Sequence, residues 1–269
     1  TYYNYLYLIE STLLIGVFKM RIFIRIMSLI IAISFASPAL SFFGLFQPKL
    51  FDLATELADK GNPNAQYILG MMYNNGFETE MDRKKAFALF QQAEQGGDKL
   101  AAFKLGCYYD GQAPEAVAVD KEKAFKYYLS SAEAGYSLAQ FVSGNMLFAK
   151  GNYEEAVYWI TKSAQQGHDR SFTNLFTLYS DPQWGVEDRA LAHQYLSIAI
   201  AKTNEAKYLP RMRDLLAENA AFLTTEQIQL AEKNAAAYVP KQTPLTLRVV
   251  RGYNELYDIR NQMVLENTK

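Results

Sequence analysis

The sequence contains very few of the side chains that most often bind metals or act as catalytic bases. Among its 269 residues there are one Cys and two His. A single Cys allows no disulfide within the chain, and it excludes Cys-rich metal sites and disulfide-stapled folds. His168 and His193 have no second His or Cys at metal-ligand spacing. We therefore interpret both as structural or solvent-facing side chains.

Sequence motifs of the common catalytic classes are also missing. The sequence has no GxSxG, HExxH or phosphate-loop motif. Glu154 and Glu155 form a carboxylate pair, but adjacent residues of a helix point about 100° apart and do not converge as an acid/base couple. Cys107 lies in the stretch LGCYY, and we interpret it as a buried small hydrophobe. We predict that the protein is not an enzyme and has no catalytic residue, metal or cofactor.

Neither sign of charge dominates the chain. It has 27 Lys and Arg against 28 Asp and Glu, which gives a net charge of −1. This balance predicts no uniformly basic surface, so nucleic acid is not the expected partner. Half of the residues are apolar, which is too much for a disordered chain of such low net charge. We expect one or two domains with a substantial core.

Residues 20–41 have the pattern of a secretory signal peptide. Two Arg precede the apolar run 26–35, and the small residues Ala39 and Ser41 stand at positions −3 and −1 of a cut before Phe42. We predict cleavage at this point and a periplasmic or secreted protein, with no stable membrane insertion afterwards.

The alternative is an uncleaved anchor in the inner membrane. No charged residue lies between Arg25 and Lys49, so this stretch is long enough to span a bilayer. Residues 1–19 precede Met20, where a complete signal begins. We predict that they are an upstream extension and not part of the working protein.

Four segments of the sequence repeat one pattern. The steps between their first residues, all Gly, are 36, 38 and 32. The steps differ because one loop in each repeat spans 9, 11 or 5 positions. The other positions of each repeat number 27 in every case. A constant register indicates one structural unit that is stacked along the chain. The segments are GNPNAQYILGMMY (61–73), GDKLAAFKLGCYY (97–109), GYSLAQFVSGNML (135–147) and GHDRSFTNLFTLY (167–179).

Both halves of each repeat have the spacing of a helix. Ala65, Leu69 and Tyr73 lie four residues apart on one face of a first half, and second halves show the same spacing. Small residues within the first halves predict close approach of paired helices, and the Gly that opens each repeat predicts a left-handed helix end. The predicted N-caps of second helices are Asp82, Asp120 and Asn152. The small residues are Gly70, Gly106 and Gly144.

These residues resemble a known family. The motif LGxxY, with AxxG and DxxxA at these spacings, is similar to Sel1-like repeats, which are relatives of tetratricopeptide repeats. The resemblance covers about residues 50–239 and is clearest in AQYILGMMYNNG (65–76) and LFQQAEQGG (89–97). It implies an all-α solenoid of helix-turn-helix repeats. The implied repeats, within a domain of residues 42–240, are 61–96, 97–134, 135–166 and 167–202.

The ends of the array depart from the repeat pattern. Phe176 stands where the first three repeats have Gly, so we expect the fourth repeat to close the stack. A leading helix at 50–60 is expected at the other end. Helices through 212–216 and after a capping box at Thr224 are expected to seal the array. Residues 241–269 show no repeat register, and we interpret them as a tail or peripheral helix of unknown role.

The resemblance also implies a function. It implies a non-catalytic, monomeric adaptor of the bacterial cell envelope that binds a partner protein through the concave face formed by the first helices. The recurrent aromatic side chains at one repeat position are equally typical of packing between repeats, and that alternative remains open. The partner-binding residues implied by the relation to tetratricopeptide repeats are Tyr67, Met71, Asn74, Phe103, Cys107, Asp110, Phe141, Asn145 and Phe148.

More specific roles are known in the family. Exported Sel1-like proteins resemble immunity proteins that neutralise secreted antibacterial effectors, and this is one form of the adaptor hypothesis. Other exported relatives are β-lactam-binding hydrolases, and an exported hydrolase of the β-lactamase type is one alternative, although those relatives are Cys-rich and this chain has one Cys. A membrane-anchored envelope scaffold is the other alternative, and it requires an uncleaved signal.

Overall fold

The structure is a computed structural model, and it describes residues 49–266, with side chains described to residue 261. The predicted extension (1–19) and signal peptide (20–41) lie outside the described residues. Within residues 49–266 the chain forms helices and short helical turns but no strand, so the predicted all-α class is confirmed. None of the described helices is long and apolar enough to cross a membrane.

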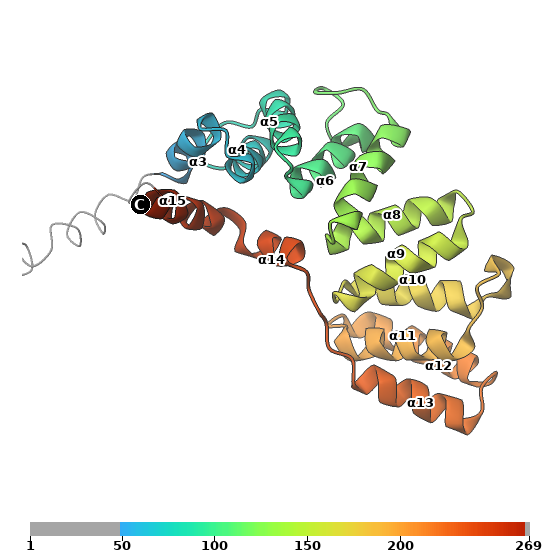
Figure 1. The fold of residues 1–269 in the computed structure, drawn as a ribbon. Helices are drawn as coiled ribbons and strands as arrows, with labels where there is room; N and C mark the ends of the chain where they lie inside the picture. The colour runs from blue at the N-terminus through green and yellow to red at the C-terminus, as the bar shows by residue number, and fades with distance from the viewer. Residues whose placement is uncertain (1–48, 267–269) are drawn as a thin grey trace, which may run out of the picture. The chain divides into compact units, whose positions relative to one another are not determined.

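The helices follow one another in antiparallel pairs in chain order (Figure 1). Each first helix packs against the second helix of its own repeat and against the helix that precedes it in the chain. The four pairs are α4 (Pro63–Asn75) with α5 (Arg83–Gln95), α6 (Lys99–Cys107) with α7 (Lys121–Glu133), α8 (Ser137–Ala149) with α9 (Tyr153–Gln165), and α10 (Asp169–Ser180) with α11 (Arg189–Lys202). The short turns are η1 (Tyr108–Gln112), η2 (Pro182–Trp184), η3 (Ala206–Tyr208) and η4 (Gly252–Asn254).

The paired helices approach closely where the sequence has Gly. A Cβ atom on Gly70 would lie 2.7 Å from the Phe90 ring, and one on Gly106 would lie 2.6 Å from the Tyr128 ring. At Gly144 the same atom would lie 2.5 Å from Cγ1 of Ile160. These distances are shorter than van der Waals contact, so only Gly lets a large side chain of the second helix lie against the first helix.

The helix ends follow the predicted chemistry with one exception. Asp82 and Asp120 each accept a hydrogen bond of 2.9 Å from a first-turn backbone N–H. The prediction for Asn152 is wrong, because its side chain makes no capping bond to the backbone. The loop before it is short and gives Asn152 a different backbone conformation, and its amide donates to Glu155 instead. The residues that open the repeats, Gly61, Gly97, Gly135 and Gly167, have φ values between 79° and 98°, as predicted.

Further helices cover both ends of the array. At one end α3 (Leu50–Asp59) buries Leu53 and Leu57 against α4. At the other end α12 (Leu209–Ala220) and α13 (Thr225–Ala236) pack on α11. The predicted capping box is present at the start of α13, where Thr224 and Gln227 bond reciprocally.

The residues after α13 return along the repeats. The chain forms α14 (Pro244–Arg251) and then α15 (Glu255–Glu266), which reaches the first helices of the array (Figure 1). Leu256 and Ile259 of α15 belong to the same buried cluster as side chains of α3 and α4. We call residues 238–261 the C-terminal strap. Of the two interpretations of residues 241–269, a tail or a peripheral helix, the structure shows helices packed on the array as far as residue 266.

We expect Gly106→Ala to destabilise the protein. The new methyl group would overlap with the Tyr128 ring, and overpacking of this kind costs about 1–3 kcal/mol. Lys126→Ala, on the exposed side of α7, is the control and should change the free energy of unfolding by less than about 0.5 kcal/mol. Urea unfolding followed by circular dichroism measures both, and equal stability of the two variants would contradict the close-approach argument.

Candidate protein-interaction surface

The first helices carry the residues predicted to bind a partner, and several of these side chains pack between repeats. Asn74 is 7% exposed and accepts a hydrogen bond of 2.7 Å from the Tyr108 hydroxyl of the next repeat. The Phe103 ring lies 5.0 Å from the Tyr136 ring, and Phe141 lies 4.4 Å from the ring of His168. These contacts connect successive repeats. A role of the same residues in partner binding stays a prediction.

The remaining predicted residues are half-buried. Asp110 forms an ion pair of 2.6 Å with Lys121. Asn145 accepts a hydrogen bond of 2.7 Å from the side chain of Asn174 in the next repeat. Met71 and Cys107 are half-buried, and burial raises the pKa of the Cys107 thiol. Phe148 packs on Tyr153 and Trp184, in a different cluster from Tyr67 and Phe103.

The structure brings Tyr67 and Phe103 together with a residue that sequence reasoning did not connect to them. Both rings contact the same buried cluster as Leu245 of the C-terminal strap. Tyr67 also lies under the guanidinium of Arg248, with 5.3 Å between its ring centroid and Cζ. Burial raises the pKa of Tyr67, which therefore stays protonated. Part of the predicted binding face thus contacts the protein's own C-terminal residues.

The strap begins with contacts to the turn between the third and fourth repeats. The Tyr238 hydroxyl donates a hydrogen bond of 2.7 Å to the carbonyl of Ala164, and the Lys241 amide donates one of 2.9 Å to Gln165. The Tyr238 ring meets the edge of Phe172 at 5.4 Å. These bonds hold the extended residues between α13 and α14 against the array.

A buried glutamine then connects the strap to the third repeat. Gln166 is 5% exposed, and its carbonyl oxygen accepts hydrogen bonds from the Thr243 amide (3.0 Å) and the Thr246 hydroxyl (2.7 Å). Its amide donates to the carbonyl of Gly135 and to Gln140, both at 2.8 Å. All of these groups are buried or half-buried and have a partner, so the network satisfies its polar atoms.

The strap also caps a helix of the array. Tyr136 stands at the N-cap position of α8 but has no side-chain oxygen within reach of the first turn. The hydroxyl of Thr246 accepts a hydrogen bond of 3.0 Å from the Ser137 amide instead. A first-turn N–H group that lacks a partner inside the helix is thereby satisfied by a residue 109 positions away.

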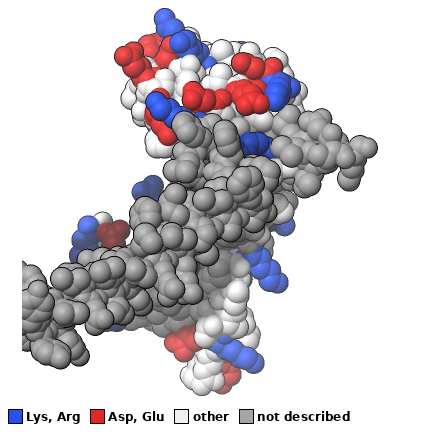
Figure 2. All heavy atoms as spheres, turned by 90° about the vertical axis from the view of Figure 1, so that its left-hand side faces the viewer, with Lys and Arg blue, Asp and Glu red and all other residues white. Residues whose placement is uncertain are grey.

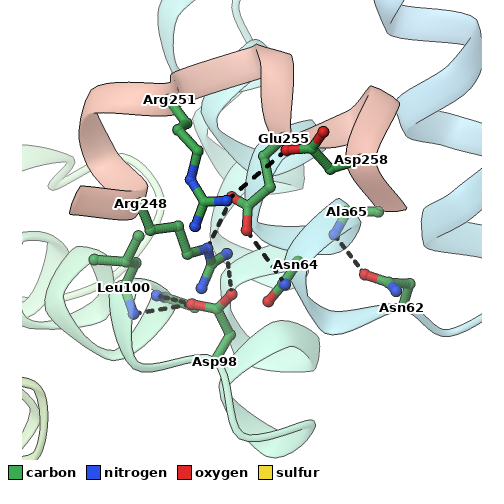
Figure 3. A network of polar contacts seen from close by, with 10 residues as sticks. Asn62, Asn64, Ala65, Asp98, Leu100, Arg248, Arg251, Glu255 and Asp258 are labelled. Carbon is green, nitrogen blue, oxygen red and sulfur yellow. Dashed lines mark hydrogen bonds and ion pairs between the residues drawn. The ribbon is translucent and has the colours of Figure 1, made fainter. Parts of the chain in front are cut away.

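An ion-pair network joins the strap to the first two repeats (Figure 3). The Arg248 side chain is 10% exposed and donates to Asp98 at 2.5 Å and to Glu255 at 2.8 Å. The Asp98 side chain is fully buried, and its second oxygen caps α6 with two bonds of 2.9 Å to Leu100 and Ala101. Burial lowers the pKa of Arg248, but the adjacent carboxylates outweigh it and raise the pKa above its ordinary value.

Sequence reasoning missed the strap because its contacts are distant along the chain. The partners of Thr243, Thr246 and Arg248 within the repeats lie 77 to 150 residues away. A local signal for a helix was present in Thr243-Pro244, since Thr is a good N-cap and Pro fits the first helical position. Thr243 does cap α14, through a hydrogen bond of 3.2 Å from the Thr246 amide.

A pocket of about 660 Å³ lies where the strap meets α9. Tyr158 and Trp159 contribute aromatic rings to its wall, and Lys162 and Lys241 contribute ammonium groups. In the described part of the chain, no group of three or more His, Cys, Asp or Glu is arranged to hold a metal ion.

Both histidines lie against other side chains of the array. The His168 ring lies against the Phe141 ring at a tilt of 35°, and its Nδ1 lies 3.1 Å from the Ser171 hydroxyl. His193 is 2% exposed, and its Nε2 lies 3.8 Å from a carboxylate oxygen of Glu232. Burial lowers the pKa of both imidazoles.

The sequence is similar to known repeat proteins. Residues 63–98, 99–136 and 139–168 each match the model of the Sel1 repeat. The fourth helix pair lies outside these matches, and it is the pair in which Phe176 replaces the close-approach Gly.

Two curated relatives are fungal. Chitin synthase regulatory factor 4 of Schizosaccharomyces pombe is 25% identical over 136 residues, which are 50% of this chain and 21% of that protein. Chitin synthase regulator SKT5 of Saccharomyces cerevisiae is 30% identical over 129 residues, 46% of this chain and 18% of that protein. This chain thus spans about a fifth of the length of these relatives.

A solved structure has a similar fold. The crystal structure of a Sel1 repeat protein from Oxalobacter formigenes aligns with a TM-score of 0.53 and 21% identity. The alignment covers 78% of this chain and 92% of that one. At this identity the likeness concerns the fold alone.

We expect Arg248→Met to loosen the strap while leaving the repeats folded. The substitution leaves the buried carboxylates of Asp98 and Glu255 without their partner, which costs about 1.5–3 kcal/mol, so amides of the strap should exchange about 10- to 100-fold faster with deuterium. Hydrogen exchange read by mass spectrometry measures this. Arg251→Met is the matched control, since Arg251 is 55% exposed in its side chain and lies 3.8 Å from Asp258. Unchanged exchange in Arg248→Met would show that the ion pairs do not hold the strap.

The buried His193 should make stability depend on pH. Its pKa in the folded protein is below the ordinary value of 6.5, so below pH 6.5 the unfolded chain binds more protons than the folded one. We expect the free energy of unfolding to decrease as the pH falls from 7 to 5.5, and to decrease less in His193→Gln. Urea unfolding at a series of pH values measures the slope, and an identical slope in the variant would argue against this role.

Proposed function

Residues 63–168 consist of Sel1 repeats, and on that premise we propose that this protein is a non-catalytic adaptor that binds a partner protein through its first helices. Sel1 repeat proteins are generally scaffolds for protein–protein interaction. The proposal rests on one position of the first helix that recurs in every repeat and that is not buried in any of them. Met71, Cys107 and Asn145 are half-buried at this position, and Thr177 is exposed. Four equivalent positions in register make a continuous line suited to an extended segment or loop of a partner.

The surface charge is compatible with a protein partner. Where Figure 2 shows described residues, Lys and Arg side chains lie beside Asp and Glu side chains. A surface of mixed charge favours local contacts over long-range attraction to a polyanion. This supports a protein rather than a nucleic acid as the partner.

We further propose that the adaptor acts as a monomer in the bacterial cell envelope, after cleavage of residues 20–41. The sequence pattern of that segment supports export. Neutralisation of a secreted effector, as an immunity protein, is the most specific form of this proposal. Fractionation combined with the mass of the N-terminal peptide distinguishes a cleaved periplasmic protein from an anchored one, since an N-terminus at Phe42 is expected only after cleavage.

A photo-crosslinking amino acid at position 177 tests the binding face. We expect irradiation of cells to link this variant to one discrete protein, because the position lies on the accessible line of the first helices. The control places the same amino acid at position 126, on the exposed side of α7. Equal crosslinking at both positions, or none at position 177 in repeated experiments, would contradict the proposal. The double variant Met71→Glu with Thr177→Glu should reduce the crosslinked product of a third position on the line by about fivefold or more.

A further inference from the structure

The strap binds three polar groups of the repeats, which are the Asp98 and Gln166 side chains and the Ser137 amide. We call them the receptor groups. Asp98 and Gln166 lie in the turns between repeats, and both are at most 5% exposed in the structure with the strap in place. The amide of Ser137 at the start of α8 is a third such group. Together with the carbonyl of Gly135, which accepts a hydrogen bond from the Thr243 hydroxyl, they bind three residues of one short segment, which are Thr243, Thr246 and Arg248.

These receptor groups are held in place by the repeats themselves. One oxygen of Asp98 is fixed by two backbone amides of α6, which leaves the other oxygen directed at the strap. The amide nitrogen of Gln166 is fixed by Gly135 and Gln140. The Ser137 amide points outward because it belongs to a first turn. The site therefore keeps its arrangement when the strap leaves it, and a preorganised site loses little conformational entropy on binding.

The distribution of polarity on α14 indicates a detachable segment. Thr246 and Arg248 face the repeats, whereas Leu247, Val249 and Val250 are 45%, 42% and 76% exposed. A helix that serves only to complete a core buries its apolar face. Buried ion pairs and hydrogen bonds gain little net free energy over contacts with water, so release of α14 costs less than release of an apolar helix. The apolar anchors of the strap, Leu256 and Ile259, lie in α15 and not in α14.

We propose that the turns carrying Asp98, Ser137 and Gln166 form a peptide-binding site, which the strap occupies as a ligand in the same chain. When the strap is displaced, the site takes a partner segment of the same chemistry: an arginine with hydroxyl side chains two and five residues before it. Asp98 and the face of Tyr67 favour a guanidinium over an ammonium, because a planar cation both pairs with a carboxylate and lies on a ring. This inference rests on the proposed function and names the chemistry of the partner.

The test measures binding of a fluorescent peptide of residues 240–261 to the full-length chain. In the double variant Thr246→Val/Arg248→Ala the strap loses two of the side chains that bind it to the repeats. Hydrogen exchange is measured first, to establish that the strap has left the site. We expect this variant to bind the wild-type peptide at least tenfold more tightly than the wild-type chain does. A peptide with Arg248→Lys should bind the same variant at least tenfold more weakly.

A second variant tests the receptor. Adding Asp98→Asn to the vacated chain should weaken peptide binding at least tenfold, and Asn is a good N-cap, so α6 stays capped. Arg251→Ala is the control chain and should behave as the wild type, since Arg251 is exposed. Failure of a vacated, folded chain to bind the peptide, or equal binding of the Arg and Lys peptides, would overturn the proposal. Peptide binding without crosslinking at position 177 would instead count against the proposed function alone.

Discussion

The helices of one repeat approach so closely that a methyl group at Gly70, Gly106 or Gly144 would overlap with the second helix. The packing of the whole array depends on this close approach. Because the backbones are close, the large side chains Phe90, Tyr128 and Ile160 lie against the first helix and reach the next repeat. A helix pair of this kind cannot bury its faces alone, so each repeat is stabilised by its neighbours. In the last pair Phe176 takes the place of Gly. Its second helix, α11, packs against the closing helices α12 and α13 where the other repeats have a further repeat.

The strap adds long-range contacts to this nearest-neighbour arrangement. A stacked array has contacts only between adjacent repeats, whereas the strap contacts the first helices, Asp98, the start of α8 and the last turn between repeats. The contacts with Asp98, the start of α8 and the last turn are hydrogen bonds and ion pairs that need particular partners. Such polar contacts fix the position of the strap more specifically than apolar packing does. Their net contribution to the stability of the bound strap is smaller than that of apolar packing.

The local chemistry of the repeats was predictable because it depends on nearby residues. The capping of Asp82 and Asp120, the left-handed Gly residues and the capping box at Thr224 all depend on residues within one turn of each other. Asn152 shows the limit of this reasoning. Its residue type suits an N-cap, but the conformation of the short preceding loop decided which group its side chain meets. The recurrent aromatic positions were also visible, although their packing between repeats depends on where neighbouring helices lie.

The sequence by itself determined the all-α class, the repeat register and the absence of common catalytic motifs, because periodicity and residue type are properties of short segments. Only the tertiary structure decided the place of residues 238–261. Their hydroxyl and guanidinium groups find partners 77 to 150 residues away, and no local pattern encodes such distances. The same holds for the binding face, since the stacking of repeats decides which side chains of a helix remain accessible once every neighbour and the strap are in place.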